Sequence, residues 1–465
     1  MLTPRFTLSQ DEQFVTVTIR VPFAKVSEAE VEVLDNELHF YSKPYHLRLY
    51  FTGDVVEEGL QTDYHCSEAS FDIKVRKKVP GTRFTDLEMI TKLLTPPGSW
   101  TLMGPAIEEL DSGFDTPVSE DLQASKSETD CKFDWLLPQS MPEEEVGAGD
   151  ATLGRHKYGF GLQQHGVFRG LTEELRLVLD VKDVDSLTPG QVRAAREELE
   201  AEAFEEEHYL ADLFYNEEID ELLNFKPWWI EVANSPAPVN DKLYFTEDEL
   251  DVLKELPRQH LHVPLDALPY TWSTLAELIF GYAYDYRTTM GSSTVESSWT
   301  VTKLSPTLSC LDSFVTIKDA LRASFRRSLI YPLYRNFELS SQILKDVCKI
   351  FSLGRRALLK CLLTIRKLCA GTQENRYILN DLYITSYCVW IQTVQEAAVR
   401  EICLEMAGLK FEKPEMDLDL VDTETAAQLA LQEEEGSGSN TTTAKVDLEQ
   451  VMAGLTIDSD DDEVE

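Results

Sequence analysis

The chain has 465 residues, of which 43 are Lys or Arg and 82 are Asp or Glu, so its formal net charge is −39. This excess of acids argues against nucleic acid and the anionic cytoplasmic membrane surface as partners, because both attract Lys and Arg. The length favours two domains with additional tails, and a hydrophobic fraction of 43% is enough for a sizeable core.

The cysteines and the N-terminal residues indicate the cellular compartment in which the protein is expected. The eight cysteines form no CxxC pair and show no regular spacing, which predicts a reducing environment. The first residues, MLTPRFTLSQDEQF, lack the basic and apolar regions of a secretory signal. No apolar run approaches the roughly 20 residues needed to span a bilayer. We therefore expect a soluble intracellular protein.

Residues 1–95 predict a β domain. Apolar and polar side chains alternate at period two in three runs, at Val15–Ile19, Leu47–Phe51 and Phe71–Val75. Turn residues such as Pro22 and the Pro80–Gly81 pair separate the runs. Several short alternating strands in under a hundred residues predict a small antiparallel sandwich.

Residues 96–155 predict an acidic and mostly disordered linker, because prolines, Ser, Gly and acids bury too little apolar surface to order it. From Ile107 to Asp150 it carries 13 acids and two lysines. Phe133 and Trp135, on either side of Asp134, are typical of a docking anchor within this protein or on a partner. A chance apolar residue, or a short strand added to a domain edge, is the alternative interpretation.

Residues 156–411 predict an all-helical domain. Ala194–Phe225 carries apolar residues mostly at three- and four-residue spacing. Capping boxes are expected at Thr246 with Glu249 and at Thr316 with Asp319. Further helices are predicted over Ser273–Tyr286, Glu338–Leu353, Arg355–Leu368 and Tyr377–Leu409, with Gly354 and Gly371 as candidate helix ends.

Residues 412–465 contain acidic runs and a Gly-Ser-Gly-Ser stretch, and they predict a disordered acidic tail. Ser459 precedes Asp460-Asp461-Asp462-Glu463, a context that acid-directed kinases favour. A phosphate there adds a charge of about −1.5 to −2. Such sites are common in disordered tails.

No pattern of catalytic residues is present, so we expect no enzyme, cofactor or metal. The histidines form no HxxxH or HExxH pair, and no cysteine or carboxylate pattern completes His260-Leu261-His262. Gly159-Phe160-Gly161 lacks the third glycine of a dinucleotide fingerprint. Neither a P-loop nor a GxSxG motif occurs.

Charge is segmental within the helical domain. Arg196–Glu221 holds 12 acids and one Arg, which predicts either a solvated helix face or a surface for a basic partner. Thr300–Ala370 holds 13 Lys or Arg and four acids. This basic block faces either nucleic acid or an internal partner such as the acidic tail. Its candidate residues are Arg322, Arg326, Arg327, Lys345, Lys349, Arg355, Arg356, Lys360, Arg366 and Lys367.

Several aromatic-rich strings resemble the SHQ-one family of H/ACA ribonucleoprotein assembly factors. They are RVPFAKV (Arg20–Val26), the Phe133-Asp134-Trp135 element, HYLADLF (His208–Phe214), KPWW (Lys226–Trp229), LSPTL (Leu304–Leu308), YPLYRNF (Tyr331–Phe337) and YILNDLYITSYCVWIQ (Tyr377–Gln392). The resemblance implies an N-terminal CS domain, a seven-stranded sandwich of the small heat-shock superfamily, followed by a family-specific all-helical domain.

The resemblance also implies a function. Members hold a dyskerin-type pseudouridine synthase before RNA is available, with the helical domain on its RNA-binding face, and RuvB-like ATPases are implicated in their release. They occur in cytoplasm and nucleoplasm and are absent from the mature particle. We expect a monomer without direct nucleic-acid binding. A co-chaperone of a heat-shock chaperone or of RuvB-like ATPases is the alternative. Candidate partner-binding residues are Glu205, Glu206, Glu207, Asp212, Glu217 and Glu218.

Overall fold

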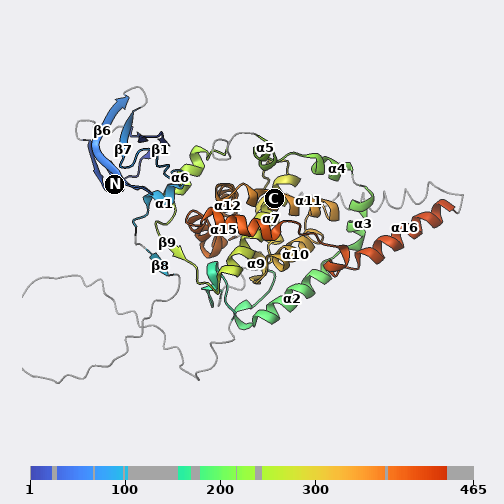
Figure 1. The fold of residues 1–465 in the computed structure, drawn as a ribbon. Helices are drawn as coiled ribbons and strands as arrows, with labels where there is room; N and C mark the ends of the chain where they lie inside the picture. Colours follow the sequence, from blue (N-terminus) through green and yellow to red (C-terminus); the bar gives the residue numbers. More distant parts are fainter. Residues whose placement is uncertain are drawn as a thin grey trace, which may run out of the picture.

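A computed structural model describes residues 2–22, 29–65, 69–97, 100–102, 156–168, 178–215, 217–235, 243–371 and 375–436. The predictions at Phe133, Trp135 and Ser459 lie outside these residues. Figure 1 shows a β domain beside one end of a larger helical domain.

The N-terminal domain is a two-layer antiparallel sandwich, as the alternating pattern predicts. Its strands are β1 (Arg5–Gln10), β2 (Phe14–Arg20), β3 (Glu30–Leu34), β4 (Glu37–Ser42), β5 (Tyr45–Tyr50), β6 (Val55–His65) and β7 (Ser70–Lys77). One sheet has the order β1-β2-β7-β6 and the other has the order β3-β4-β5. Alternate side chains such as Val15, Val17 and Ile19 are fully buried between the layers.

The second domain consists of helices around α7, whose side chains are buried on nearly every side. The helices are α2 (Pro189–Glu202), α3 (Glu206–Phe214), α4 (Glu217–Asn224), α5 (Trp228–Asn234), α6 (Glu247–Glu255), α7 (Leu268–Thr288), α8 (Ser297–Leu304), α9 (Pro306–Cys310), α10 (Ile317–Ser328), α11 (Phe337–Ser352), α12 (Arg355–Ala370), α13 (Tyr377–Leu379), α14 (Thr385–Trp390), α15 (Glu396–Met406) and α16 (Leu420–Gly436). Short turns add η3 (Phe160–Leu162), η4 (Val184–Ser186), a π-helix η6 (Asn380–Ile384) and η7 (Lys413–Met416).

The predicted helix ends are largely confirmed. The Thr246 and Glu249 side chains cap α6 reciprocally, and the Thr316 hydroxyl accepts the Asp319 N–H at the start of α10. Gly354 separates α11 from α12 at φ +87°, where a Cβ is strained. The helical structure expected over Tyr377–Leu409 consists of α13, η6 and α14 in succession and, after a turn, α15.

Two domain limits differ from the prediction. Within the expected linker, β8 (Trp100–Leu102) pairs in parallel with β9 (His260–His262). Within the expected tail, η7 and α16 are ordered because Met416, Leu418 and Leu420 are buried in the helical core. The backbone carbonyls of η7 also accept hydrogen bonds from arginines of α10.

Contacts join the two domains through α1 (Ile90–Leu94), which follows the sandwich. The Thr91 hydroxyl donates to the Leu253 carbonyl of α6 at 2.6 Å and is buried. Arg355 at the start of α12 forms an ion pair with Asp86, whose carboxylate also contacts Lys92. The sandwich is therefore bound to the helical domain by both polar and charged contacts.

Candidate functional site

Helix α2 turns one charged side toward the core. Its stripe of Val192, Arg196 and Glu200 is buried, and these residues are spaced by four along the helix. Arg196 contacts Glu200 at 2.8 Å and Asp312 at 3.0 Å, while Arg327 reaches Glu200 at 3.0 Å. Buried charges require such pairing, because an isolated ion loses its hydration without compensation. This network fixes which face of α2 points to solvent.

A partly buried carboxylate, Asp180, extends this network. It contacts Arg327 at 2.7 Å and Lys303 at 2.6 Å. Burial alone raises the pKa of Asp180, but the two cations outweigh burial and hold this pKa below its usual value. Asp180 therefore stays ionised at neutral pH and keeps Arg327 in position.

Helix α3 is held by Tyr209 and Asp212 on its inner side and by Glu205, which directly precedes it. Buried Tyr209 donates its hydroxyl hydrogen to Glu424 of α16 at 2.6 Å. The backbone N–H of Arg335 donates to the Asp212 carboxylate at 2.5 Å, and the Arg335 guanidinium contacts Glu205 at 2.8 Å. Burial raises the pKa of Asp212, although the Arg335 N–H acts against it. Asp212 is therefore an internal contact of α3.

Helix α4 is held at its C-terminal end. Ile219 and Leu222 are buried, and the Arg287 guanidinium donates to the carbonyls of Leu222, Leu223 and Phe225. Arg287 also pairs with buried Asp346 at 2.7 Å. Because the last carbonyls of a helix lack intrahelical partners, this arginine supplies the missing donors.

The outward sides of these helices carry most of the acids of the Arg196–Glu221 stretch. We define the acidic face as the ten exposed carboxylates of α2–α4 and the residues between them: Glu197, Glu198, Glu202, Glu205, Glu206, Glu207, Glu217, Glu218, Asp220 and Glu221. Figure 1 places α3 and α4 at the end of the helical domain away from the sandwich. Exposed Phe214, the last residue of α3, and Tyr215, which follows it, add apolar surface.

Five of the six predicted partner-binding residues belong to the acidic face, and Asp212 does not. The Asp212 side chain is only 17% exposed, against 65% for Glu205, because the Arg335 loop covers it. Sequence reasoning counted the other exposed acids of α2 and α4 in the acidic stretch without choosing them as candidates, and it missed the arginines that orient these helices. No local pattern marks this inward side, because the exposed Arg193 and Glu197 have the same four-residue spacing as the buried Arg196 and Glu200.

The basic block does not form a basic face of the extent that the sequence suggested. Arg326 and Arg327 contact Glu200, and Arg322 contacts Asp417. Arg355 and Arg356 contact Asp86 and Glu88 of the N-terminal segment, while Lys360 contacts Glu249. The expectation of internal partners is confirmed, but most of these partners lie outside the acidic tail. The nucleic-acid interpretation of this block loses its main support.

Other chemistry is sparse within the described parts of the chain. No group of three or more His, Cys, Asp or Glu side chains there is arranged to hold a metal ion. Burial raises the pKa of the Cys310, Cys361, Cys369 and Cys388 thiols, so these cysteines are poor nucleophiles. No helix among the described residues is long and apolar enough to cross a membrane.

Comparison with protein-family models places two matches on this chain. The model described as "SHQ1-like, CS domain" matches residues 3–94, which cover the sandwich and α1. The model described as "SHQ1 protein, Shq1 domain" matches residues 234–420. The second match begins after α4, so neither model includes the helices of the acidic face.

Curated relatives extend the similarity across those helices. A "Protein SHQ1 homolog" of Danio rerio is 39% identical over 437 residues, covering 93% of this chain and 72% of the relative. A homologue of the same name from Mus musculus is 37% identical and covers 94% and 77%. "Protein shq1" of Schizosaccharomyces pombe is 34% identical and covers 92% and 97%.

Proposed function

The chain belongs to the SHQ1 family, and from that premise we propose that it is an assembly chaperone of H/ACA ribonucleoproteins. It binds a dyskerin-type pseudouridine synthase before RNA does. The acidic face covers the basic RNA-binding face of that enzyme and acts as an RNA mimic. The sandwich is the CS domain of the family.

One observation carries this proposal. Nine exposed carboxylates lie on three helices, and a tenth, Glu205, directly precedes α3; buried ion pairs and hydrogen bonds hold the inward sides of these helices. Lys and Arg that bind phosphate attract carboxylates by the same Coulomb interaction. Because these helices are held in place before binding, their backbone requires little further ordering, which favours affinity. The exposed aromatics Phe214 and Tyr215 offer surfaces for cations between the carboxylates.

The complex with the synthase must both form rapidly and dissociate before the particle is complete. Electrostatic attraction makes association fast and sensitive to salt. RNA and this chain exclude each other from the synthase, so the chain must leave before the particle matures. We assign that release to RuvB-like ATPases and place the monomeric chaperone in cytoplasm and nucleoplasm.

Charge reversal of the acidic face tests the proposal. Glu206 and Glu207 are the best positions, because both are exposed and Glu205 is already paired with Arg335. We expect Glu206→Lys with Glu207→Lys to weaken synthase binding by about tenfold or more at low salt, mainly through slower association. Surface plasmon resonance at several salt concentrations measures this effect.

The matched control reverses two exposed carboxylates elsewhere, Glu401 and Glu405 of α15. Glu401→Lys with Glu405→Lys changes the net charge by the same amount. Its change in log Kd should be less than half of that of the Glu206 and Glu207 double variant. If both double variants lost the same affinity for the synthase, the effect would come from the overall charge of the chain and not from the acidic face. An RNA guide that binds the synthase together with the wild-type chain at the same face would refute mimicry.

A further inference from the structure

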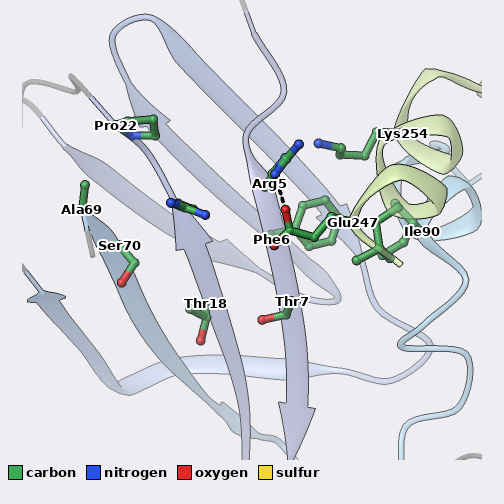
Figure 2. A pocket seen from close by; sticks show the side chains of 12 residues that line it. Arg5, Phe6, Thr7, Thr18, Pro22, Ala69, Ser70, Ile90, Glu247 and Lys254 are labelled. Atoms are coloured by element: carbon green, nitrogen blue, oxygen red, sulfur yellow. Dashed lines mark hydrogen bonds and ion pairs between the residues drawn. The ribbon is translucent and has the colours of Figure 1, made fainter. Parts of the chain in front are cut away.

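A cleft of about 600 Å³ lies between the sandwich and α6. Figure 2 shows it above the outward face of β1 and β2, with α6 on one side and Pro22 and Ala69 on the other. The outward side chains Thr7 and Thr18 line it, and they are register partners on neighbouring strands. The cleft is distinct from the acidic face on α2–α4.

The cleft is bordered by cations. Arg5 reaches Glu247 at 2.8 Å and also contacts Asp251, so it bridges from β1 to α6. Lys254 lies beside them and contacts Asp251 at 2.6 Å. Arg20 is exposed, and within the described residues no carboxylate pairs with it. This arginine is available to an incoming anion.

A buried hydroxyl without a partner lies next to Arg20. Ser70 is opposite Arg20 in the β2–β7 register and is only 3% exposed. Among the described residues no group hydrogen-bonds its Oγ atom, although this atom is buried and Ser70 lines the cleft. Buried polar atoms are nearly always satisfied, so such an atom suggests a ligand group that is absent.

The cleft also has an apolar floor. The partly buried Leu250 of α6 supplies it, while Phe6 and Ile90 line the cleft with only 5% and 4% of their surface exposed. A cavity with an apolar floor and a few polar groups suits a peptide that offers large apolar side chains and carboxylates. The Arg20 guanidinium and the Ser70 hydroxyl both donate hydrogen bonds, which also favours a carboxylate ligand.

We propose that this cleft binds the acidic segment around Phe133-Asp134-Trp135 of the same chain. The aromatic rings contact the apolar side of the cleft at Leu250, and the Asp134 carboxylate accepts hydrogen bonds at Arg20. Charge complementarity supports this occupant, because Ile107–Asp150 carries 13 acids against two lysines. This occupant is the internal form of the docking that the sequence predicts for Phe133 and Trp135.

The length of the chain permits this contact. From Leu102, Phe133 is 31 residues away, which spans up to about 100 Å when extended. From Trp135 back to His156 there are 21 residues, or about 70 Å. Either span exceeds the diameter of about 40–50 Å of a domain of this size. The segment therefore reaches the cleft without moving either domain.

A labelled peptide of residues 128–140 tests the proposal by fluorescence anisotropy. The receptor is the full chain carrying Phe133→Ala and Trp135→Ala, whose own segment no longer competes. We expect saturable binding, at least fivefold tighter than to the wild-type chain. Adding Arg20→Glu to the receptor should weaken binding tenfold or more, because it places a carboxylate opposite the peptide's acids.

The matched control is Arg76→Glu, which reverses an exposed arginine of β7 that does not line the cleft. It should change peptide affinity less than twofold, and both single variants should unfold at the same temperature as the parent. Equal binding to the Arg20 and Arg76 variants, or equal binding to the wild-type and double-alanine chains, overturns the proposal. Dimers of the wild-type chain that Arg20→Glu abolishes would identify a second copy as the occupant and would overturn it too.

Discussion

The acidic stretch Arg196–Glu221 and the basic stretch Thr300–Ala370 are both strongly charged in the sequence, but they differ in the fold. The acids of the first are mostly exposed, whereas many basic residues of the second form internal ion pairs. Ten of the 12 acids in the first are exposed. In the second, Arg326 and Arg327 pair with Glu200, and Arg355 and Arg356 pair with carboxylates of the N-terminal segment. A run of like charges therefore predicts a charged surface only when the fold holds few opposite charges within reach.

The physical reason lies in where each charge falls relative to the apolar stripe. Arg327 and Arg356 occupy inward positions of their helices, where burial without a partner is unfavourable. Their long side chains reach carboxylates far away in sequence. The acids of α3 and α4 fall mostly on the solvent side, where water stabilises them. Removing single charges from the two regions should consequently have very different effects on stability.

The largest effect is expected for Arg327→Ala. Arg327 is fully buried between Glu200 and Asp180, and its loss leaves two carboxylates with fewer cations. Breaking a buried pair in this way costs about 3–5 kcal/mol. Urea unfolding followed by near-UV circular dichroism measures the loss. Lys345→Ala, at an exposed position of the same basic block, is the control and should change the unfolding free energy by less than about 0.5 kcal/mol.

A pH titration sharpens the contrast between paired and unpaired buried acids. Glu277 is buried without a cation among the described residues and accepts hydrogen bonds only from Ser305 and Thr307. Burial raises its pKa to about 8. A raised pKa stabilises the folded state fully below the unfolded pKa of about 4.3, and that stabilisation is lost as pH rises through about 8.

We therefore expect Glu277→Gln to flatten the decline in unfolding free energy between pH 5 and 8. The full difference is on the order of a few kcal/mol, at 1.36 kcal/mol per pKa unit. Urea unfolding at a series of pH values checks this slope. A decline as steep in the variant as in the wild type would mean that Glu277 is already ionised at neutral pH.

A smaller effect is expected at the boundary between the domains. Arg355 is 11% exposed and pairs with Asp86 of the sandwich and with Glu396 of α15. Asp86 keeps Lys92 as a second partner, so Arg355→Ala should cost only about 1–3 kcal/mol. Limited proteolysis should then release the N-terminal domain faster. Arg400→Ala, at an exposed arginine, should leave the cleavage rate unchanged.

The smallest effect on stability is expected on the acidic face. Glu207 is exposed and has no ion pair among the described residues, so Glu207→Gln should change the unfolding free energy by less than about 1 kcal/mol. The same substitution should still slow association with the synthase. Thermal unfolding and association rates, measured side by side, separate the two effects. A large loss of stability would show that Glu207 belongs to the internal network.

Local patterns predicted much of this fold. Alternation at Val15, Val17 and Ile19 gave the sandwich, and the Thr246 and Thr316 caps located two helix starts. Long-range contacts could not be predicted from local patterns. For example, nothing in the sequence near Trp100 indicates that its strand pairs with the strand of His260. The ordering of Met416 likewise depends on a core assembled from distant residues.

In the candidate site, too, local features were predictable from the sequence and long-range contacts were not. The acids of the face were visible as a charge run, but Asp212 was assigned to it because sequence cannot show the Arg335 loop that covers its carboxylate. Arg287, which holds α4, lies more than sixty residues away and carries no local signal. The density of exposed charge was predictable, whereas the contacts that hold it in place were not.

Carbodiimide crosslinking with the synthase tests the central claim most directly, because this reagent joins carboxylates to lysines that contact them. The account predicts crosslinks from synthase lysines to the exposed acids of α3 and α4, above all Glu206, Glu207 and Glu221, and their loss when guide RNA is bound first. Crosslinks confined to other exposed acids, such as Glu401 and Glu405 of α15, would contradict it.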